Sequence, residues 1–115
     1  MLDAANRIGG GGGPANSHGL ITAKAPGARY ARVFNSLGVE NLADPQFADG
    51  PADMFFSAPA ADRAAVEELI TAVGLRPVYL GDGQQEVVDG VLRLWFALVM
   101  GQGHSRHMAF RLLER

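Results

Sequence analysis

Residues 52–83, ADMFFSAPAADRAAVEELITAVGLRPVYLGDG, decide the fold class. Ala52–Ala58 contains three consecutive large apolar residues, as expected for a strand that is covered on both faces. Pro59 opens a helix whose apolar residues follow the i, i+3, i+4, i+7 pattern: Val66, Leu69, Ile70 and Val73. Gly74 is placed to end this helix, and Arg76–Leu80 has the pattern of another strand. The order strand, helix, strand predicts an α/β sheet.

The N-terminal part of the chain extends the same alternation. Arg29–Phe34 is predicted to be a strand, because its aromatic and β-branched residues favour extended backbone, and Leu20–Ala25 is predicted to be a short helix. Met1–Asn6 has the pattern of the last residues of a buried strand and the polar turn after it. The chain therefore begins in the middle of a strand–helix–strand pattern. We expect residues 1–83 to form a partial Rossmann-like sheet, the second half of a dinucleotide-binding domain without its glycine fingerprint.

Residues 84–115 are predicted to form C-terminal helices that serve packing or oligomerisation. One broad helical face carries Val88, Val91, Leu92, Trp95, Leu98 and Val99, and other apolar residues cover much of the remaining circumference. A helix that is apolar nearly all round needs covering on several sides, either by a partner subunit or by a missing half of the domain. We therefore expect self-association, as a homo-oligomer. Ser105–Arg115 is predicted to be a short terminal helix that turns Met108, Ala109, Leu112 and Leu113 inward.

The composition excludes several classes of protein. A formal net charge of −2 and a pI near 5.8 do not favour nucleic acid as a partner, because nucleic-acid-binding surfaces are basic. The chain has no cysteine, so it has neither a disulfide framework nor a thiolate metal site. Its longest nearly uncharged apolar run, Leu94–Met100, is far shorter than the ~20 residues of a membrane helix. We expect a cytoplasmic protein without a membrane partner.

Two asparagines follow predicted strands and are the candidate binding residues. Asn6 follows the first strand and Asn35 follows the second, so parallel strands would bring both side chains to the carboxyl edge of the sheet, where ligands of such sheets bind. A carboxamide donates and accepts hydrogen bonds at once, which suits recognition of a nicotinamide amide or a ribose hydroxyl. The alternative is that both asparagines only terminate strands by bonding local backbone.

Other motifs point away from specific chemistry. Gly9–Gly13 lacks both the Lys-Ser/Thr pair of a phosphate loop and the spaced glycines of a dinucleotide fingerprint, so we interpret it as a flexible loop. His104 and His107 could share a helix face, but no third ligand stands at a recognisable spacing, and no metal is expected. With Arg106 and Arg111 these histidines are more consistent with a solvated basic face.

Several stretches together resemble one enzyme family. MLDAANR resembles the Asp-x-x-Asn-Pro strand and turn of the NADPH-dependent deazaflavin (coenzyme F-420) reductases and related NADP-binding oxidoreductases. ARVFNSLGVENLADPQF resembles that family's Lys-Ala-Phe-Asn-Thr strand and the connection after it. PADMFFSAP resembles the next strand, and LWFALVMGQGHSRHMAFRLLER resembles the closing helices. The resemblance covers essentially the whole chain.

The resemblance implies a Rossmann-type NADP-binding enzyme that moves hydride between a nicotinamide and a deazaflavin, coenzyme F-420, or a similar acceptor. It implies that Asn6 and the loop after it, including Arg7, lie beside the nicotinamide, with Asn35 near the same crevice. Arg7 stands where the family usually has proline, and Arg32 stands where it usually has lysine. The glycine-rich half that would hold the phosphates is missing from this sequence.

The sequence leaves three hypotheses open. The chain is expected to be either a portion of such an oxidoreductase or a truncated, non-catalytic remnant that acts as an oligomerisation or binding module. A small α/β ligand-binding domain unrelated to redox chemistry is a third hypothesis.

Overall fold

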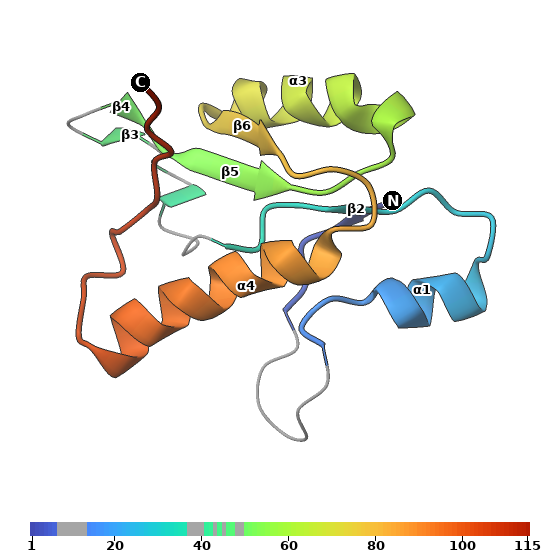
Figure 1. Cartoon of the computed structure of the whole chain (residues 1–115), viewed down its shortest axis with the longest axis horizontal. Coiled ribbons are helices and arrows are strands. Elements are labelled where there is room, and N and C mark those ends of the chain that lie inside the picture. The colour runs from blue at the N-terminus through green and yellow to red at the C-terminus, as the bar shows by residue number, and fades with distance from the viewer. Residues whose placement is uncertain (7–13, 37–40, 43, 45, 48–49) are drawn as a thin grey trace.

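The computed structural model describes residues 1–6, 14–36, 41–42, 44, 46–47 and 50–115 (Figure 1). Two pairs of parallel strands form its centre. β1 (Leu2–Asp3) pairs with β2 (Ala31–Arg32), and β5 (Asp53–Phe56) pairs with β6 (Arg76–Tyr79). The α/β fold expected from the sequence is thus confirmed.

The two strand pairs run in opposite directions. The backbone N–H of Arg32 donates to the carbonyl of Ser57 at 2.8 Å, and the N–H of Ser57 donates back to Arg32 at 3.1 Å. This exchange is the mark of an antiparallel contact, and it joins β2 to the residue after β5. The carboxyl ends of β1 and β2 therefore lie at one edge of the sheet, and those of β5 and β6 lie at the other.

Helices cover both faces of these strands (Figure 1). The 3-10 turn η1 (Ala60–Asp62) leads into α3 (Arg63–Val73), which contributes the core residues Val66 and Ile70. Gly74 follows with a φ of 99°, the left-handed conformation that glycine adopts readily at a helix end. On the other face, α4 (Gln85–Phe96) buries Val88, Asp89, Leu92 and Trp95. No helix in the described residues combines the length and the apolar character that a membrane span needs.

The N-terminal elements are shorter than the sequence predicts, apart from the helix. α1 (His18–Lys24) begins two residues before the expected start. The strand predicted over Arg29–Phe34 is reduced to β2, because Phe34 has a φ of 61° and turns the chain out of the extended conformation. A short antiparallel pair, β3 (Gln46–Phe47) with β4 (Gly50–Pro51), lies in the connection between β2 and β5.

The prediction of a terminal helix over Ser105–Arg115 is wrong. A π-helical turn, η2 (Ala97–Gly101), ends the helical region, and Gly103 has a φ of 75°. Beyond it, residues 104–115 form no helix, and the segment passes the beginning of β5 and ends beside β4 (Figure 1).

The backbone of this segment finds partners outside itself. Phe110 accepts a hydrogen bond from the N–H of Asp53 at 2.9 Å, and Met108 accepts one from the Trp95 indole at 3.2 Å. These contacts replace the hydrogen bonds that a helix would have made. Leu112 and Leu113, expected to face inward, are exposed.

Candidate functional site

A fully buried arginine underlies the carboxyl edge of β1 and β2. The guanidinium of Arg32 donates through Nε to Oδ1 of Asp89 at 2.8 Å, and its Nη1 lies 3.6 Å from Oδ1 of Asp3. Nη1 also donates to the carbonyls of Asp3 and Ala5, and Nη2 donates to Oδ1 of Asn6 at 2.8 Å. One side chain therefore holds the end of β1, the turn after it and a residue of α4.

The two carboxylates of this cluster anchor the chain that returns from residue 14. Asp3 Oδ2 accepts hydrogen bonds from the Tyr30 hydroxyl at 2.5 Å and from the Ser17 N–H at 2.8 Å. Asp89 Oδ2 accepts from the backbone N–H of Asn16 at 3.1 Å and from its Nδ2 at 2.6 Å. The segment before α1 is thereby joined to both β1 and α4.

These contacts shift the acidity of two groups. Burial raises the pKa of Asp3, but hydrogen bonds from Tyr30, Ser17 and Ala5 together with the charge of Arg32 outweigh it, so this pKa lies below its ordinary value. The pKa of Tyr30 is raised, first by burial and then by its hydrogen bond to Asp3. The phenol therefore stays protonated and remains a donor.

We expect Asp3 to make the fold sensitive to acid. Its pKa is lower in the folded protein than the ordinary value of 3.8, so it stabilises the fold fully above that value. This stabilisation is lost as the pH falls below 3.8 and through the folded pKa. Urea unfolding measured from neutral pH downward should show the loss, and Asp3→Asn should flatten it. Identical pH dependence in the two proteins would contradict this assignment.

Asn6 and Asn35 lie together above this cluster, where the parallel strands β1 and β2 end. Nδ2 of Asn6 donates to the backbone carbonyl of Asn35 at 3.0 Å, while its Oδ1 is held by Arg32. The carboxamide of Asn6 is thus oriented by two fixed partners. The alternative that Asn6 bonds only its own local backbone is wrong, because Arg32 and Asn35, to which it is hydrogen-bonded, are remote in sequence.

Asn35 is the unusual member of the pair. Its side chain is 2% exposed, yet neither Nδ2 nor Oδ1 has a hydrogen-bond partner in the part of the chain that the structure describes. A buried amide without partners costs about 1–3 kcal/mol per unsatisfied group, and native proteins contain few of them. Phe34, the residue before it, holds the left-handed conformation that is rare for bulky residues and is concentrated at functional sites. Strained backbone and unpaired polar atoms therefore occur at the same point.

The other residues singled out in the sequence are not seen at this edge of the sheet. Arg7 and Gly9–Gly13 lie outside the described residues. His104 and His107 are not on a helix, so the possibility that they share a helix face is wrong. His104, Arg106, His107 and Arg111 are all exposed, as a solvated basic face requires, and Arg106 stacks over Trp95 at 5.2 Å. Within the described ranges, no group of three His, Cys, Asp or Glu side chains is arranged to hold a metal ion.

The buried partners of Arg32 were missed by pattern reasoning. Asp89 stands within the apolar pattern of α4 and is 0% exposed. A charged residue on a helix face that is otherwise apolar is the signal that could have found it, because such a residue needs a partner of opposite charge.

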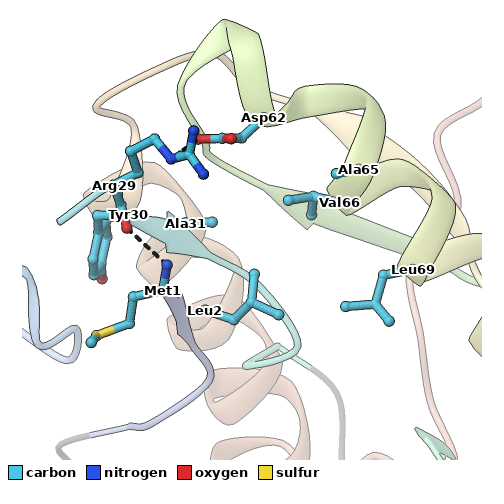
Figure 2. Close-up of a pocket in the computed structure, with 9 residues that line it drawn as sticks. All are labelled: Met1, Leu2, Arg29, Tyr30, Ala31, Asp62, Ala65, Val66 and Leu69. Atoms are coloured by element: carbon cyan, nitrogen blue, oxygen red, sulfur yellow. Dashed lines mark hydrogen bonds and ion pairs between the residues drawn. The ribbon is translucent and has the colours of Figure 1, made fainter.

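A separate apolar groove lies at the outer edge of β1, beside α3 (Figure 2). It holds about 250 Å³, and Leu2, Val66 and Leu69 form its apolar wall. At its rim the amino group of Met1 donates to the Arg29 carbonyl at 2.9 Å. Among the described strands, β1 pairs only with β2, so its other edge is open at this groove. The groove lies on the side of β1 that faces α3, and neither Asn6 nor Asn35 lines it.

Comparison with solved structures identifies the architecture. The backbone matches a protein from Arthrobacter sp. FB24, provisionally named an F-420-dependent NADP reductase, with a TM-score of 0.79 over 98% of this chain. The fold is Rossmann-like. The sequence identity is 22%, so this likeness concerns the fold. The hypothetical protein SMa0349 from Sinorhizobium meliloti matches 70% of this chain at 30% identity, with a TM-score of 0.57.

The chain spans 56% of the Arthrobacter protein and 43% of the Sinorhizobium protein. No protein-family model and no curated protein matches the sequence. These likenesses therefore support a Rossmann-like fold and no particular activity.

Proposed function

We propose that this chain supplies the nicotinamide-facing portion of an NADP-dependent oxidoreductase. The enzyme would transfer hydride between NADP and a deazaflavin such as coenzyme F-420, or a similar acceptor. The observation that carries this proposal is the buried carboxamide of Asn35, unpaired in the described part of the chain, at the carboxyl ends of two parallel strands. In open α/β sheets this edge is where ligands bind.

The chemistry of the residues fits a nicotinamide. Asn35 offers an amide nitrogen and an amide oxygen that have no partner among the described residues, and a nicotinamide carboxamide offers the complementary groups. Asn6, exposed and held by Arg32, stands beside it as a further amide. Hydride transfer needs no protein acid or base as such, because the protein's task is to position two rings and exclude competing reactions. Positioned amides are therefore the kind of side chain that this reaction uses.

The phosphates of NADP need other partners. The charge of Arg32 is already taken by Asp3 and Asp89, so it does not serve an anion. We propose that the phosphates of NADP are held by residues other than those of this edge of the sheet. The chain by itself is then expected to bind NADPH more weakly than in the low-micromolar range, and tight binding in calorimetry would contradict this part of the proposal.

The test separates binding from stability. Replacing Asn35 with leucine removes two buried polar atoms that have no partner among the described residues and keeps the branched shape of the side chain, so Asn35→Leu should raise the free energy of unfolding by about 1 kcal/mol. The same variant should lose the saturation-transfer NMR signal that the nicotinamide protons of millimolar NADPH give with the wild-type protein.

Asn41 offers a matched control. It is as buried as Asn35, but its Nδ2 donates to the carbonyl of Arg106 at 2.8 Å. Asn41→Leu should therefore lower the free energy of unfolding by about 1–2 kcal/mol and keep the NADPH signal. A wild-type protein without any nicotinamide signal, or an Asn35→Leu variant with an undiminished one, would overturn the proposal.

A further inference from the structure

The guanidinium of Arg32 has an acceptor for each of its nitrogens. Nε donates to Oδ1 of Asp89 at 2.8 Å, and Nη1 donates to the carbonyls of Asp3 and Ala5. Nη2 lies 2.8 Å from Oδ1 of Asp89 and donates to Oδ1 of Asn6 at 2.8 Å. The side chain of Arg32 is fully buried, so these contacts are made without competition from bulk water. Of the three side chains that it contacts, only that of Asn6 belongs to an exposed residue.

The two ends of the Asn6 carboxamide face groups of opposite character. Its Oδ1 faces the Nη2 donor of Arg32, and its Nδ2 donates to the Asn35 carbonyl at 3.0 Å. A half-turn of the amide would set N–H groups against the guanidinium and an oxygen against the carbonyl, so both contacts would become repulsive. Nδ2 carries two hydrogens and makes one hydrogen bond within the described residues, which leaves its second N–H for a ligand. Oδ1, in contrast, already accepts a charge-assisted hydrogen bond.

We propose that Arg32 is a positioning residue of the nicotinamide site. It acts through Asn6, whose carboxamide it orients so that an N–H group faces the ligand. This inference rests on the proposed function and adds to it the group that the ligand must offer at Asn6. That group is a hydrogen-bond acceptor, which in NADPH is the carbonyl oxygen of the nicotinamide carboxamide. A ligand with only a donor at this point is rejected, because two N–H groups would meet.

A lysine at position 32 would not orient Asn6 in this way. Its ammonium is a compact charge, whereas the planar guanidinium reaches acceptors on several sides at once. An ammonium held by the buried carboxylates of Asp3 and Asp89 keeps the charge balance of the cluster and leaves Oδ1 of Asn6 without its donor. Arg32→Lys therefore separates the orientation of Asn6 from the charge balance of the interior.

The orientation of Asn6 can be tested without a ligand. In ¹⁵N-labelled protein, the side-chain amide resonances of Asn6 should move in Arg32→Lys toward the positions of a solvent-exposed asparagine. Arg29→Lys is the matched control, because it makes the same exchange at a side chain that is 76% exposed, and it should leave these resonances in place. Unchanged Asn6 resonances in a folded Arg32→Lys protein would overturn the proposal.

NADPH titrations followed by NMR distinguish positioning from support of the fold. Arg32→Lys should weaken NADPH binding about fivefold, because the Asn6 hydrogen bond to the ligand is lost. In the Asn6→Ala background the same exchange should weaken binding no further, because the amide through which Arg32 acts is absent. Equal weakening in both backgrounds would mean that Arg32 does not act through Asn6 and would overturn the proposal.

Asn6→Asp tests the polarity of the contact while Arg32 stays in place. An aspartate keeps the shape of the side chain and an oxygen for Arg32, but it replaces the N–H group with a second oxygen. NADPH binding should fall at least about tenfold, because two acceptors then meet. Undiminished binding in Asn6→Asp, with the nicotinamide signal still lost in Asn35→Leu, would overturn this inference and leave the proposed function standing. A wild-type protein without any nicotinamide signal would overturn both.

Discussion

Replacing Arg32 with leucine should remove a large share of the protein's stability at room temperature. The change strands two carboxylates, those of Asp3 and Asp89, in an interior where both side chains are almost fully buried. Removing one partner of a buried ion pair costs about 3–5 kcal/mol. A whole domain is stable by only about 5–15 kcal/mol, so this single loss is a large share of the total. Far-UV circular dichroism and urea unfolding measure it.

Two companion variants isolate the cause. Arg29→Leu breaks an ion pair with Asp62 at 3.4 Å, but the Arg29 side chain is 76% exposed, so the cost should stay below about 1 kcal/mol. Combining Arg32→Leu with Asp89→Leu removes one of the stranded charges and should recover part of the lost stability. If Arg32→Leu unfolds no more easily than Arg29→Leu, the buried cluster does not hold the site together as described.

Asp53→Ala should release the C-terminal segment from the sheet. The buried Asp53 carboxylate accepts from Nε of Arg76 at 2.6 Å and from the N–H of Leu112 at 2.5 Å. Together with Nη2 of Arg76, which donates to the Leu112 carbonyl at 2.7 Å, it ties the segment to β5 and β6. Without it, residues after Met108 lose a charge-assisted anchor, and we expect trypsin to cleave after Arg111 at least about tenfold faster.

Asp62→Ala serves as the control for this prediction. Within the described residues the side chain of Asp62 pairs with the exposed Arg29, far from the C-terminal segment. Its cleavage rate after Arg111 should match that of the wild type. Equal cleavage in Asp53→Ala and wild type would show that the other contacts, such as Arg76 to the Leu112 carbonyl and the Asp53 N–H to the Phe110 carbonyl, hold the segment.

The elements with a clear local signal are the ones that sequence predicts well. The strand, helix and strand over residues 53–79 follow from a buried apolar run, a helical period and Gly74, and the structure has them within a few residues. The meeting of Asn6 and Asn35 follows from the parallel pairing of β1 and β2. The first case rests on residues near one another in the chain, and the second on the rule that the carboxyl ends of parallel strands meet at one edge of a sheet.

The predictions that fail are those that depend on contacts between residues distant in sequence. The segment after Ser105 has the apolar period of a helix, but its carbonyls are taken by Trp95, Asn41 and Asp53, all distant in sequence. The partners of Arg32 come from β1 and α4, so no spacing rule relates them. The missing hydrogen bonds of Asn35 are visible only once its surroundings are known.

The side-chain amide resonances of Asn35 and Asn6 give the most direct test of the binding site. In ¹⁵N-labelled protein, titration with NADPH should move the Nδ2 signals of both residues, with the larger shift at Asn35 because its amide gains a partner that it lacks among the described residues. Resonances around the groove of Leu2 and Leu69 should stay in place. Shifts confined to that groove, with both asparagine amides unmoved at millimolar NADPH, would contradict the assignment of this edge as the nicotinamide site.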